Sequence, residues 1–373
     1  MNNNLALYIH YPYCVNKCPY CDFNSDVKPY EDKGFDDMYL RTVKKEFDLF
    51  VPYLEDRKFV SIFFGGGTPS LANAAFIRDL VKYFEPYTQP NAEITVEANP
   101  GTAHTHKFKA YRDCGVNRMS IGVQSFNDKS LERLGRIHTG EDGRAAVRMA
   151  QQLGFSNINI DIIHGIPGQT VESSLEDLRQ AVDLDPAHIS WYELTIEENT
   201  EFGRHPPELP PEEVLEEIEE TGFHFLNVHN YMRYEVSAFC RDNIRCVHNQ
   251  NYWQFGDYIG LGAGAHSKMS FIDQTLRRNN VADPRAYIED FTRNKFARVP
   301  DDKIPFEYML NRLRLFDPIL KQDFKDRTSL DFSLVEDKLQ KASRLGLINW
   351  QKSRYSLTAK GRMNINAIVK LFM

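Results

Sequence analysis

The sequence predicts an α/β protein, built as a partial (β/α)6 barrel with an α+β extension at its carboxyl end. Six apolar strand patterns occur in the first 194 residues, and a helical pattern follows each of them except the last. Glycines and polar residues come directly after several strands, where barrels place their chemistry. Four prolines between residues 206 and 211 then end the alternation. Together these observations favour a partial barrel over a doubly wound sheet.

The predicted strands and helices alternate in order along the chain. The strands are Leu5–His10, Phe59–Phe64, Glu93–Ala98, Arg118–Val123, Asn157–Ile163 and His188–Leu194. The helical segments are Asp36–Val51, Ala74–Phe84, one that ends near Cys114, two at about 127–135 and 141–153, and one near 172–184. The second strand is a continuous apolar run, which is typical of a strand buried on both faces of a parallel sheet.

Three regions are expected along the chain. Residues 1–235 are assigned to the barrel, 236–300 to an aromatic and glycine-rich connecting region, and 301–373 to a winged-helix-like domain. An acidic helix is expected near the end of the first region, an irregular stretch around its boundary, and helices with a hairpin in the last region. The acidic helix is Glu212–Phe225, and the irregular stretch is Tyr231–Gly264. The helices of the last region are Phe306–Phe316 and Leu334–Leu345, and its hairpin joins Leu347–Trp350 to Tyr355–Leu357.

Composition narrows the class of protein. The net charge of −7 over 373 residues argues against a nucleic-acid binder. The start Met-Asn-Asn-Asn has no signal-peptide pattern, and no run of about 18 apolar residues predicts a membrane span. Six cysteines in 373 residues do not indicate a secreted disulfide scaffold, and Cys114, Cys240 and Cys246 have no pairing pattern. Free thiolates at a metal site, as described next, imply a reducing compartment, so a cytoplasmic protein is expected.

Three cysteines form the main candidate metal site. Cys14, Cys18 and Cys21 are separated by three and two residues, so their thiolates can converge on one centre. Thiolates select iron–sulfur clusters, zinc or cuprous copper, and closed zinc sites take four ligands. An iron–sulfur cluster held by three cysteines leaves one iron open for chemistry. Two alternatives remain at this point: a zinc-stabilised binding protein, or cysteines buried as small apolar residues.

Further candidates follow the later strands. The stretch Gly65-Gly66-Gly67-Thr68-Pro69 lets the backbone approach a ligand closely, although a plain tight turn is the alternative. Glu97 ends a strand, and its carboxylate can accept hydrogen bonds from two ribose hydroxyls. Gln124, Arg136 and Asp161 are individually weak candidates. All of these residues are expected to lie at one mouth of the barrel.

The motifs resemble a known family. The cysteine spacing, with Tyr20 before the third cysteine, resembles the radical S-adenosylmethionine superfamily. Together with four further motifs, this spacing resembles the heme chaperone branch of the oxygen-independent coproporphyrinogen III oxidase-like family. The motifs are Gly-Gly-Gly-Thr-Pro-Ser, Glu-Ala-Asn-Pro-Gly, Gly-Val-Gln-Ser-Phe and His-Asn-Gln-Asn-Tyr-Trp. The resemblance implies that Cys14, Cys18 and Cys21 hold a [4Fe-4S] cluster. It also implies that S-adenosylmethionine contacts Tyr8, Tyr20, Gly66, Gly67, Thr68, Glu97, Gln124, Arg136 and Asp161.

Two positions separate the possible functions. The oxidases of this family carry a further cysteine two residues after the third, where this chain has Phe23, so the resemblance leaves catalysis open. His248 is a candidate axial ligand of heme iron, with Tyr252, Trp253 and Phe255 as packing for the porphyrin. The alternative role of His248 is to cap a loop beside an aromatic core.

The resulting hypothesis is a heme chaperone that carries the cluster and S-adenosylmethionine and delivers heme to apo-hemoproteins. The resemblance further implies a homodimer and transient contact with membrane-bound hemoproteins. The alternative function is an oxidative decarboxylase of porphyrinogen propionates. Residues 260–265 formally match a dinucleotide-binding fingerprint, but no βαβ unit surrounds them, so this interpretation is rejected.

Overall fold

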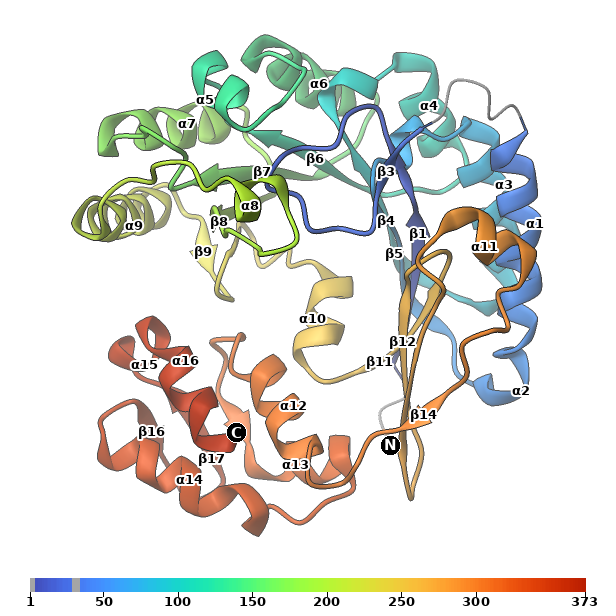
Figure 1. Ribbon diagram of the computed structural model, residues 1–373. Helices are drawn as coiled ribbons and strands as arrows, with labels where there is room; N and C mark the ends of the chain where they lie inside the picture. The colour runs from blue at the N-terminus through green and yellow to red at the C-terminus, as the bar shows by residue number, and fades with distance from the viewer. Residues whose placement is uncertain (1–3, 29–33) are drawn as a thin grey trace.

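Most strands of the protein belong to one sheet that is open at both edges. The computed structural model describes residues 4–28 and 34–373. Within these residues, twelve strands form a sheet in the order β14-β13-β12-β11-β1-β4-β5-β6-β7-β8-β10-β9. The sheet curves as in a barrel, but its edge strands do not meet (Figure 1). The predicted partial barrel is therefore confirmed.

Six parallel strands form the centre of the sheet and confirm the six predicted strands. Each pairs in parallel with the next one along the chain. They are β1 (Leu5–Tyr11), β4 (Phe59–Gly66), β5 (Thr88–Ala98), β6 (Arg118–Gln124), β7 (Asn157–His164) and β8 (His188–Glu193). Because parallel strands end on the same side, the loops that follow them gather at one mouth. The cysteine loop, with the short strands β2 (Tyr13–Cys14) and β3 (Asp26–Val27), follows β1.

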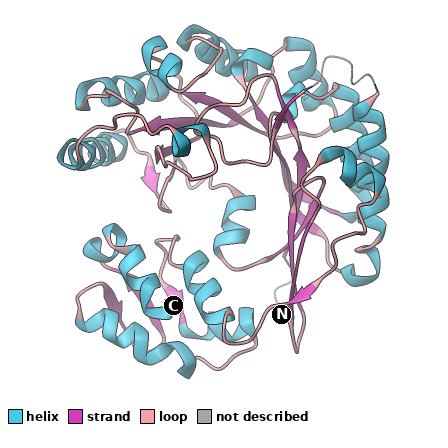
Figure 2. Ribbon diagram, viewed as in Figure 1, coloured by secondary structure: helices cyan, strands magenta, loops and turns pink. Residues whose placement is uncertain are grey.

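Helices cover the outer face of this sheet (Figure 2). They are α1 (Phe35–Asp48), α2 (Val51–Leu54), α3 (Ala74–Phe84), α4 (Thr105–Asp113), α5 (Asp128–Arg133), α6 (Gly140–Gln152), α7 (Val171–Asp183) and α9 (Glu212–Val228). The short helix α8 (Glu201–Arg204) lies instead beside the cysteine loop, where the N–H of Phe202 donates to the carbonyl oxygen of Pro19 at 2.8 Å. Thr139 and Asp142 form a capping box at the start of α6, which satisfies amide groups that the helix itself leaves without partners. The largest apolar core lies between these helices and the strands.

The stretch expected to be irregular, residues 231–264, is instead ordered, so that expectation was wrong. It contains β9 (Met232–Arg233), β10 (Ala238–Cys240), α10 (Val247–Trp253) and β11 (Asp257–Leu261). Strand β10 pairs antiparallel with β8, and β11 pairs in parallel with β1. These elements have only two to seven residues, too few to show a clear hydrophobic period.

The residues expected to connect two domains extend the sheet. After β11 the chain adds β12 (His266–Ser270), β13 (Thr275–Asn279) and β14 (Ala297–Arg298), with α11 (Pro284–Glu289) before β14. Helix α10 lies inside the curve of the sheet, on the side opposite the outer helices (Figure 1). It contacts β1, β4 and β11, and also α12 of the last part of the chain.

The last part of the chain has its own apolar core. Its helices are α12 (Ile304–Arg312), α13 (Lys321–Thr328), α14 (Ser333–Arg344), α15 (Ala359–Met363) and α16 (Ile365–Val369). A small antiparallel sheet joins β15 (Ile319–Leu320), β17 (Arg354–Leu357) and β16 (Ile348–Trp350). Helices followed by the β16–β17 hairpin are the arrangement expected for a winged-helix-like segment. No helix within the described residues combines the length and the hydropathy needed to cross a bilayer.

Candidate functional site

A cavity of about 520 Å³ lies at the carboxyl ends of the parallel strands. Eleven of the thirteen predicted site residues line it: Cys14, Cys18, Tyr20, Cys21, Gly66, Gly67, Thr68, Glu97, Gln124, Arg136 and Asp161. The prediction that the polar residues after the strands share one mouth is thereby confirmed. Tyr8 and His248 are not part of the cavity wall and are described below.

The cysteine loop is held in shape by its own backbone and by one lysine. The N–H of Cys21 donates to the carbonyl oxygen of Cys18 at 3.0 Å. Lys17 Nζ donates to the carbonyl oxygens of Ser25 at 2.7 Å and Phe23 at 3.4 Å, which draws the two ends of the loop together. The loop therefore presents its three thiols to the cavity without a disulfide.

The three thiols fit a cluster better than a single ion. Burial raises the pKa of the Cys14 and Cys21 thiols, so a bound metal has to displace their protons. Arg136 Nη1 lies 3.5 Å from Cys18 Sγ and supplies positive charge beside that sulfur. Among the residues that the structure describes, no three His, Cys, Asp or Glu side chains converge closely enough to hold one ion. In a cluster each thiolate binds its own iron, so the sulfurs need not converge on a point.

The glycine stretch packs directly against the cysteine loop. Gly66 has φ = +114°, and a Cβ at this position would lie 2.7 Å from the carbonyl oxygen of Tyr11. The N–H groups of Gly67 and Thr68 donate to the carbonyl oxygens of Tyr11 and Tyr13, both at 2.8 Å. Glycine is required here because a side chain would push the two backbones apart. The amide N–H groups are thus occupied, so this stretch would meet a ligand's amino group with its carbonyl oxygens.

Two carboxyl groups lie in the cavity wall. The N–H of Gly66 donates to Glu97 Oε2 at 3.3 Å. Burial, together with the nearby Asp161, raises the pKa of Glu97 to about 8. Asp161 accepts hydrogen bonds from Ser120 Oγ at 3.0 Å and Asn159 Nδ2 at 2.8 Å, while burial raises its pKa. Near neutral pH the Glu97 carboxyl is largely protonated, so it can both donate to and accept from a hydroxyl pair.

Gln124 and Arg136 are fixed by contacts at the end of β6. Gln124 has φ = +68°, a left-handed conformation that turns the chain out of the strand. Its Oε1 accepts a hydrogen bond from the hydroxyl of Tyr192 at 2.8 Å. Arg136 Nη2 donates to the carbonyl oxygen of Gly122 at 2.9 Å, and its Nε is buried without a partner among the described residues. This guanidinium can therefore donate a further hydrogen bond to an anionic ligand.

Tyr8 lies on β1, behind the cavity wall. Its hydroxyl is 3.0 Å from His10 Nδ1, and His10 Nε2 is 2.7 Å from the carbonyl oxygen of Asn24 in the cysteine loop. Burial lowers the pKa of His10 to about 4, so the ring is neutral. Tyr8 thus supports the cysteine loop through His10.

His248 lies on α10, inside the barrel, and not in a loop as expected. Its side chain is 1% exposed. Nδ1 is 3.0 Å from Ser61 Oγ, and Nε2 is 3.1 Å from the hydroxyl of Tyr252. The ring stacks on Phe63 with 4.7 Å between the centroids, and burial lowers the pKa of His248 to about 3. Other residues of the same helix, Asn249 and Trp253, do line the cavity.

Several residues of the site were not found from the sequence. Ser120, Ser190 and Tyr192 line the cavity from strands β6 and β8. A signal for the first two was present, because polar residues alternate with apolar ones along these strands and so face the barrel interior. Glu235 and Arg314 also line the cavity, and Arg314 lies over the ring of Trp253 at 4.3 Å. These two residues come from segments whose place beside the barrel follows only from the tertiary structure.

Comparisons with known proteins agree with this architecture. The radical SAM superfamily matches residues 8–181, and the HemN C-terminal domain matches residues 299–363. Proteins named heme chaperone HemW from Haemophilus influenzae and Escherichia coli are each 41% identical to this chain, over 99% of it and 98% of their own length. The HemW of Bacillus subtilis is 32% identical over 99% of both chains.

A solved structure supports the fold. Coproporphyrinogen III oxidase (HemN) from Escherichia coli, described as a radical SAM enzyme, superposes with a TM-score of 0.83 at 24% identity. The match covers 99% of this chain and 89% of the oxidase. Radical SAM proteins carry a [4Fe-4S] cluster and S-adenosylmethionine, and the cysteine triad and cavity described above have the donors that both require. The full-length identity to its relatives shows that this chain belongs to the heme chaperone HemW family of the radical SAM superfamily.

Proposed function

We propose that the protein binds heme and delivers it to apo-hemoproteins, while it carries a [4Fe-4S] cluster and S-adenosylmethionine. The observation that carries this proposal is the 41% identity, along 99% of the chain, to two proteins named heme chaperone HemW. The exposed phenyl group of Phe23 on the cavity wall supports it as well. This residue replaces the cysteine that the family's oxidases are expected to carry.

The cavity residues would hold the two cofactors. Cys14, Cys18 and Cys21 would bind the cluster, which supplies one-electron chemistry when S-adenosylmethionine is bound to its open iron. Arg136 has a donor left for the ligand's carboxylate, and the largely protonated Glu97 suits the two ribose hydroxyls. Tyr20, Gly66, Gly67, Thr68, Gln124 and Asp161 would complete the contacts to S-adenosylmethionine, and Tyr8 would support the site from behind.

Heme binding through His248 would require a change at α10. Both ring nitrogens are engaged within the barrel, so an axial bond to iron would replace a partner such as Tyr252. Asn249 and Trp253 already reach the cavity from the same helix. We therefore place the heme on the cavity side of α10, with the Trp253 ring as apolar packing and His248 as the ligand once the helix moves.

One experiment separates heme transfer from the alternative oxidase activity, for which the cluster and S-adenosylmethionine would also be needed. The cluster is reconstituted under anaerobic conditions, and the protein is titrated with hemin while the Soret band is followed. The loaded protein is then mixed with apomyoglobin as acceptor, and coproporphyrinogen III is offered in a separate assay. We expect saturable heme uptake and transfer without decarboxylation. Repeated turnover of coproporphyrinogen III without heme uptake would instead establish the oxidase.

Partners and location belong to the same proposal. We propose a cytoplasmic protein that forms a homodimer and makes transient contact with membrane-bound hemoproteins. Light scattering with and without the cluster and S-adenosylmethionine tests the dimer. A mass that stays at one chain in all four states would contradict it.

A further inference from the structure

A continuous series of hydrogen bonds crosses the barrel interior, from the cavity to the base of α10. Asn159 Nδ2 donates to Asp161 Oδ1 at 2.8 Å. His188 Nδ1 is 2.6 Å from Asn159 Oδ1, and His188 Nε2 is 2.8 Å from the hydroxyl of Tyr234. The N–H of Cys246 donates to this hydroxyl at 3.3 Å, and Cys246 is the N-cap of α10. We call these five residues the Asp161–Cys246 network.

All donors of this network point toward Asp161. His188 is 1% exposed, and burial lowers its pKa well below the ordinary value, so its ring is neutral and has one donor nitrogen. The amide oxygen of Asn159 can only accept, so His188 Nδ1 carries the hydrogen and Nε2 accepts the hydroxyl hydrogen of Tyr234. Aligned hydrogen bonds polarise one another, so a change at the Asp161 end affects the Cys246 end.

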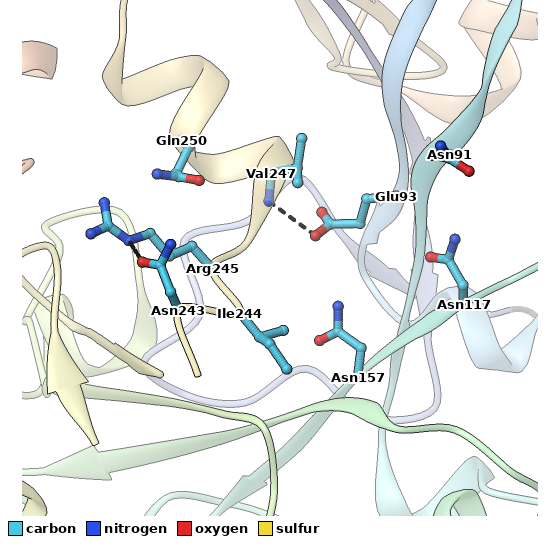
Figure 3. A pocket seen from close by; sticks show the side chains of 9 residues that line it. All are labelled: Asn91, Glu93, Asn117, Asn157, Asn243, Ile244, Arg245, Val247 and Gln250. Atoms are coloured by element: carbon cyan, nitrogen blue, oxygen red, sulfur yellow. Dashed lines mark hydrogen bonds between the residues drawn. The ribbon is translucent and has the colours of Figure 1, made fainter. Parts of the chain in front are cut away.

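A second buried group holds the same end of α10. The carboxylate of Glu93 accepts a hydrogen bond from the N–H of Val247 at 2.9 Å (Figure 3). It also accepts one from the N–H of His248 at 3.1 Å. Arg118 Nε lies 3.9 Å from Glu93 Oε2, and Glu93 itself is 6% exposed. The first turn of α10 is thus held by two polar attachments inside the barrel, Glu93 and Tyr234.

The outer side of this helix end borders open space. A cavity of about 570 Å³ lies near the amino ends of the parallel strands, with Val247 and Gln250 of α10 in its wall (Figure 3). Val247 is 39% exposed. On this side the first turn of α10 therefore borders a cavity at Val247, whereas its other side is packed against the barrel interior.

We infer that the Asp161–Cys246 network couples ligand binding in the cavity to the position of α10. Through α10 it would also control whether His248 stays enclosed in the barrel or becomes accessible. The inference rests on the proposed function, in which Asp161 contacts S-adenosylmethionine and His248 binds heme. A donor group on the ligand competes with Asn159 for the Asp161 carboxylate. The network is then weakened along its length, the first turn of α10 loosens, and His248 becomes accessible to heme.

The first test needs no heme. Hydrogen exchange of the backbone amides at residues 246–248 is measured by mass spectrometry on the cluster-reconstituted protein, with and without S-adenosylmethionine. These are the amides that donate to Tyr234 and Glu93. We expect S-adenosylmethionine to speed their exchange about fivefold, the lower end of ordinary coupling between sites. No change in the wild-type protein would overturn the inference.

Two matched tyrosine variants locate the effect. Tyr234→Phe removes the hydroxyl of the network, so exchange at 246–248 is expected to be fast already and to stay unchanged on addition of S-adenosylmethionine. Tyr231→Phe removes another buried hydroxyl, which donates to the carbonyl oxygen of Pro186 at 2.7 Å outside the network, and keeps the wild-type response. His188→Asn interrupts the network at its centre and is expected to behave as Tyr234→Phe. A wild-type response in both network variants would overturn the inference.

The second test measures heme affinity with and without S-adenosylmethionine in the same variants. Wild type and Tyr231→Phe should bind heme about fivefold more tightly when S-adenosylmethionine is present, and heme should strengthen S-adenosylmethionine binding by the same factor. In Tyr234→Phe this factor should fall to about one. Heme affinity that is independent of S-adenosylmethionine in wild type overturns the coupling alone, whereas absence of heme binding overturns the proposed function.

Discussion

The imidazole of His248 is hydrogen-bonded to Ser61, a residue of β4 that lies 187 positions earlier in the chain, with 3.0 Å between Nδ1 and Oγ. The ring also stacks on Phe63 of the same strand. His248 is therefore a structural part of the barrel interior in this conformation, in addition to the heme ligand proposed above. We therefore expect its substitution to affect both the free energy of unfolding and heme binding.

His248→Ala should lower the free energy of unfolding by about 2–3 kcal/mol, because Ser61 and Tyr252 lose a buried partner. It should also weaken heme binding and shift the Soret band, while cluster content stays unchanged. Chemical denaturation and heme titration measure the two effects. The matched variant Ser61→Ala removes one hydrogen bond, about 1 kcal/mol, and should keep the wild-type Soret band. If His248→Ala keeps the Soret band and the heme affinity of the wild type, His248 is not a heme ligand and has only its structural role.

Changing Cys14, Cys18 or Cys21 to Ser should abolish the brown absorbance of the reconstituted cluster without unfolding the protein. The thiols are on a loop at the mouth, and the apolar core lies between sheet and helices. Iron and sulfide analysis, together with the circular dichroism melt, measures the outcome. Cys114→Ser serves as control, because Cys114 lies outside the cysteine loop and should leave iron content unchanged. Wild-type iron and sulfide in the triple variant would contradict the assignment.

The protein should be unable to decarboxylate coproporphyrinogen III, because it has a phenyl group at Phe23 in place of a thiol. Phe23 is 59% exposed and lines the cavity, at the position where the family's oxidases are expected to carry a further cysteine. Chromatography of the porphyrin products after incubation with reductant and S-adenosylmethionine measures this. Multiple turnovers by the wild-type protein would contradict the expectation.

Glu97 should make stability depend on pH. Its pKa is about 8 in the folded protein and near 4.5 when unfolded, so the folded state retains a proton that the unfolded state releases between these values. This contribution is complete below about pH 4.5 and is lost as the pH rises through 8. Between pH 5 and 9, this proton lowers the unfolding free energy of the wild type by about 4 kcal/mol. Glu97→Gln has no such proton, so its unfolding free energy should fall less over this range, by about that amount.

Urea denaturation at several pH values measures the difference for Glu97. Glu132→Gln is a matched control, since Glu132 lies on the short helix α5 and is exposed to solvent. Parallel pH profiles for wild type and Glu97→Gln would show that the proton is not held at this carboxyl.

Much of the site could be predicted because its signals are local. The spacing of Cys14, Cys18 and Cys21 belongs to one loop, and Gly66 and Glu97 each follow an apolar strand pattern. Once strands are known to be parallel, residues after them must meet at one mouth. The buried position of the His248 side chain could not be predicted this way, because its partners Ser61 and Phe63 are on a strand far away in the sequence. The Asp161–Cys246 network likewise joins residues from four segments: β7, β8, the residues between β9 and β10, and the start of α10.

The alternation of strands and helices, the cysteine triad and the residues at the ends of the strands can all be read from the chain, since each depends on sequence neighbours. The position of α10 inside the barrel cannot, and neither can the attachment of its first turn to Glu93 and Tyr234 or the enclosure of His248. These features depend on burial among residues that are distant in the chain. A short helix with polar groups at its base is stable inside a barrel only when distant strands supply a hydrogen-bond partner for each of those groups.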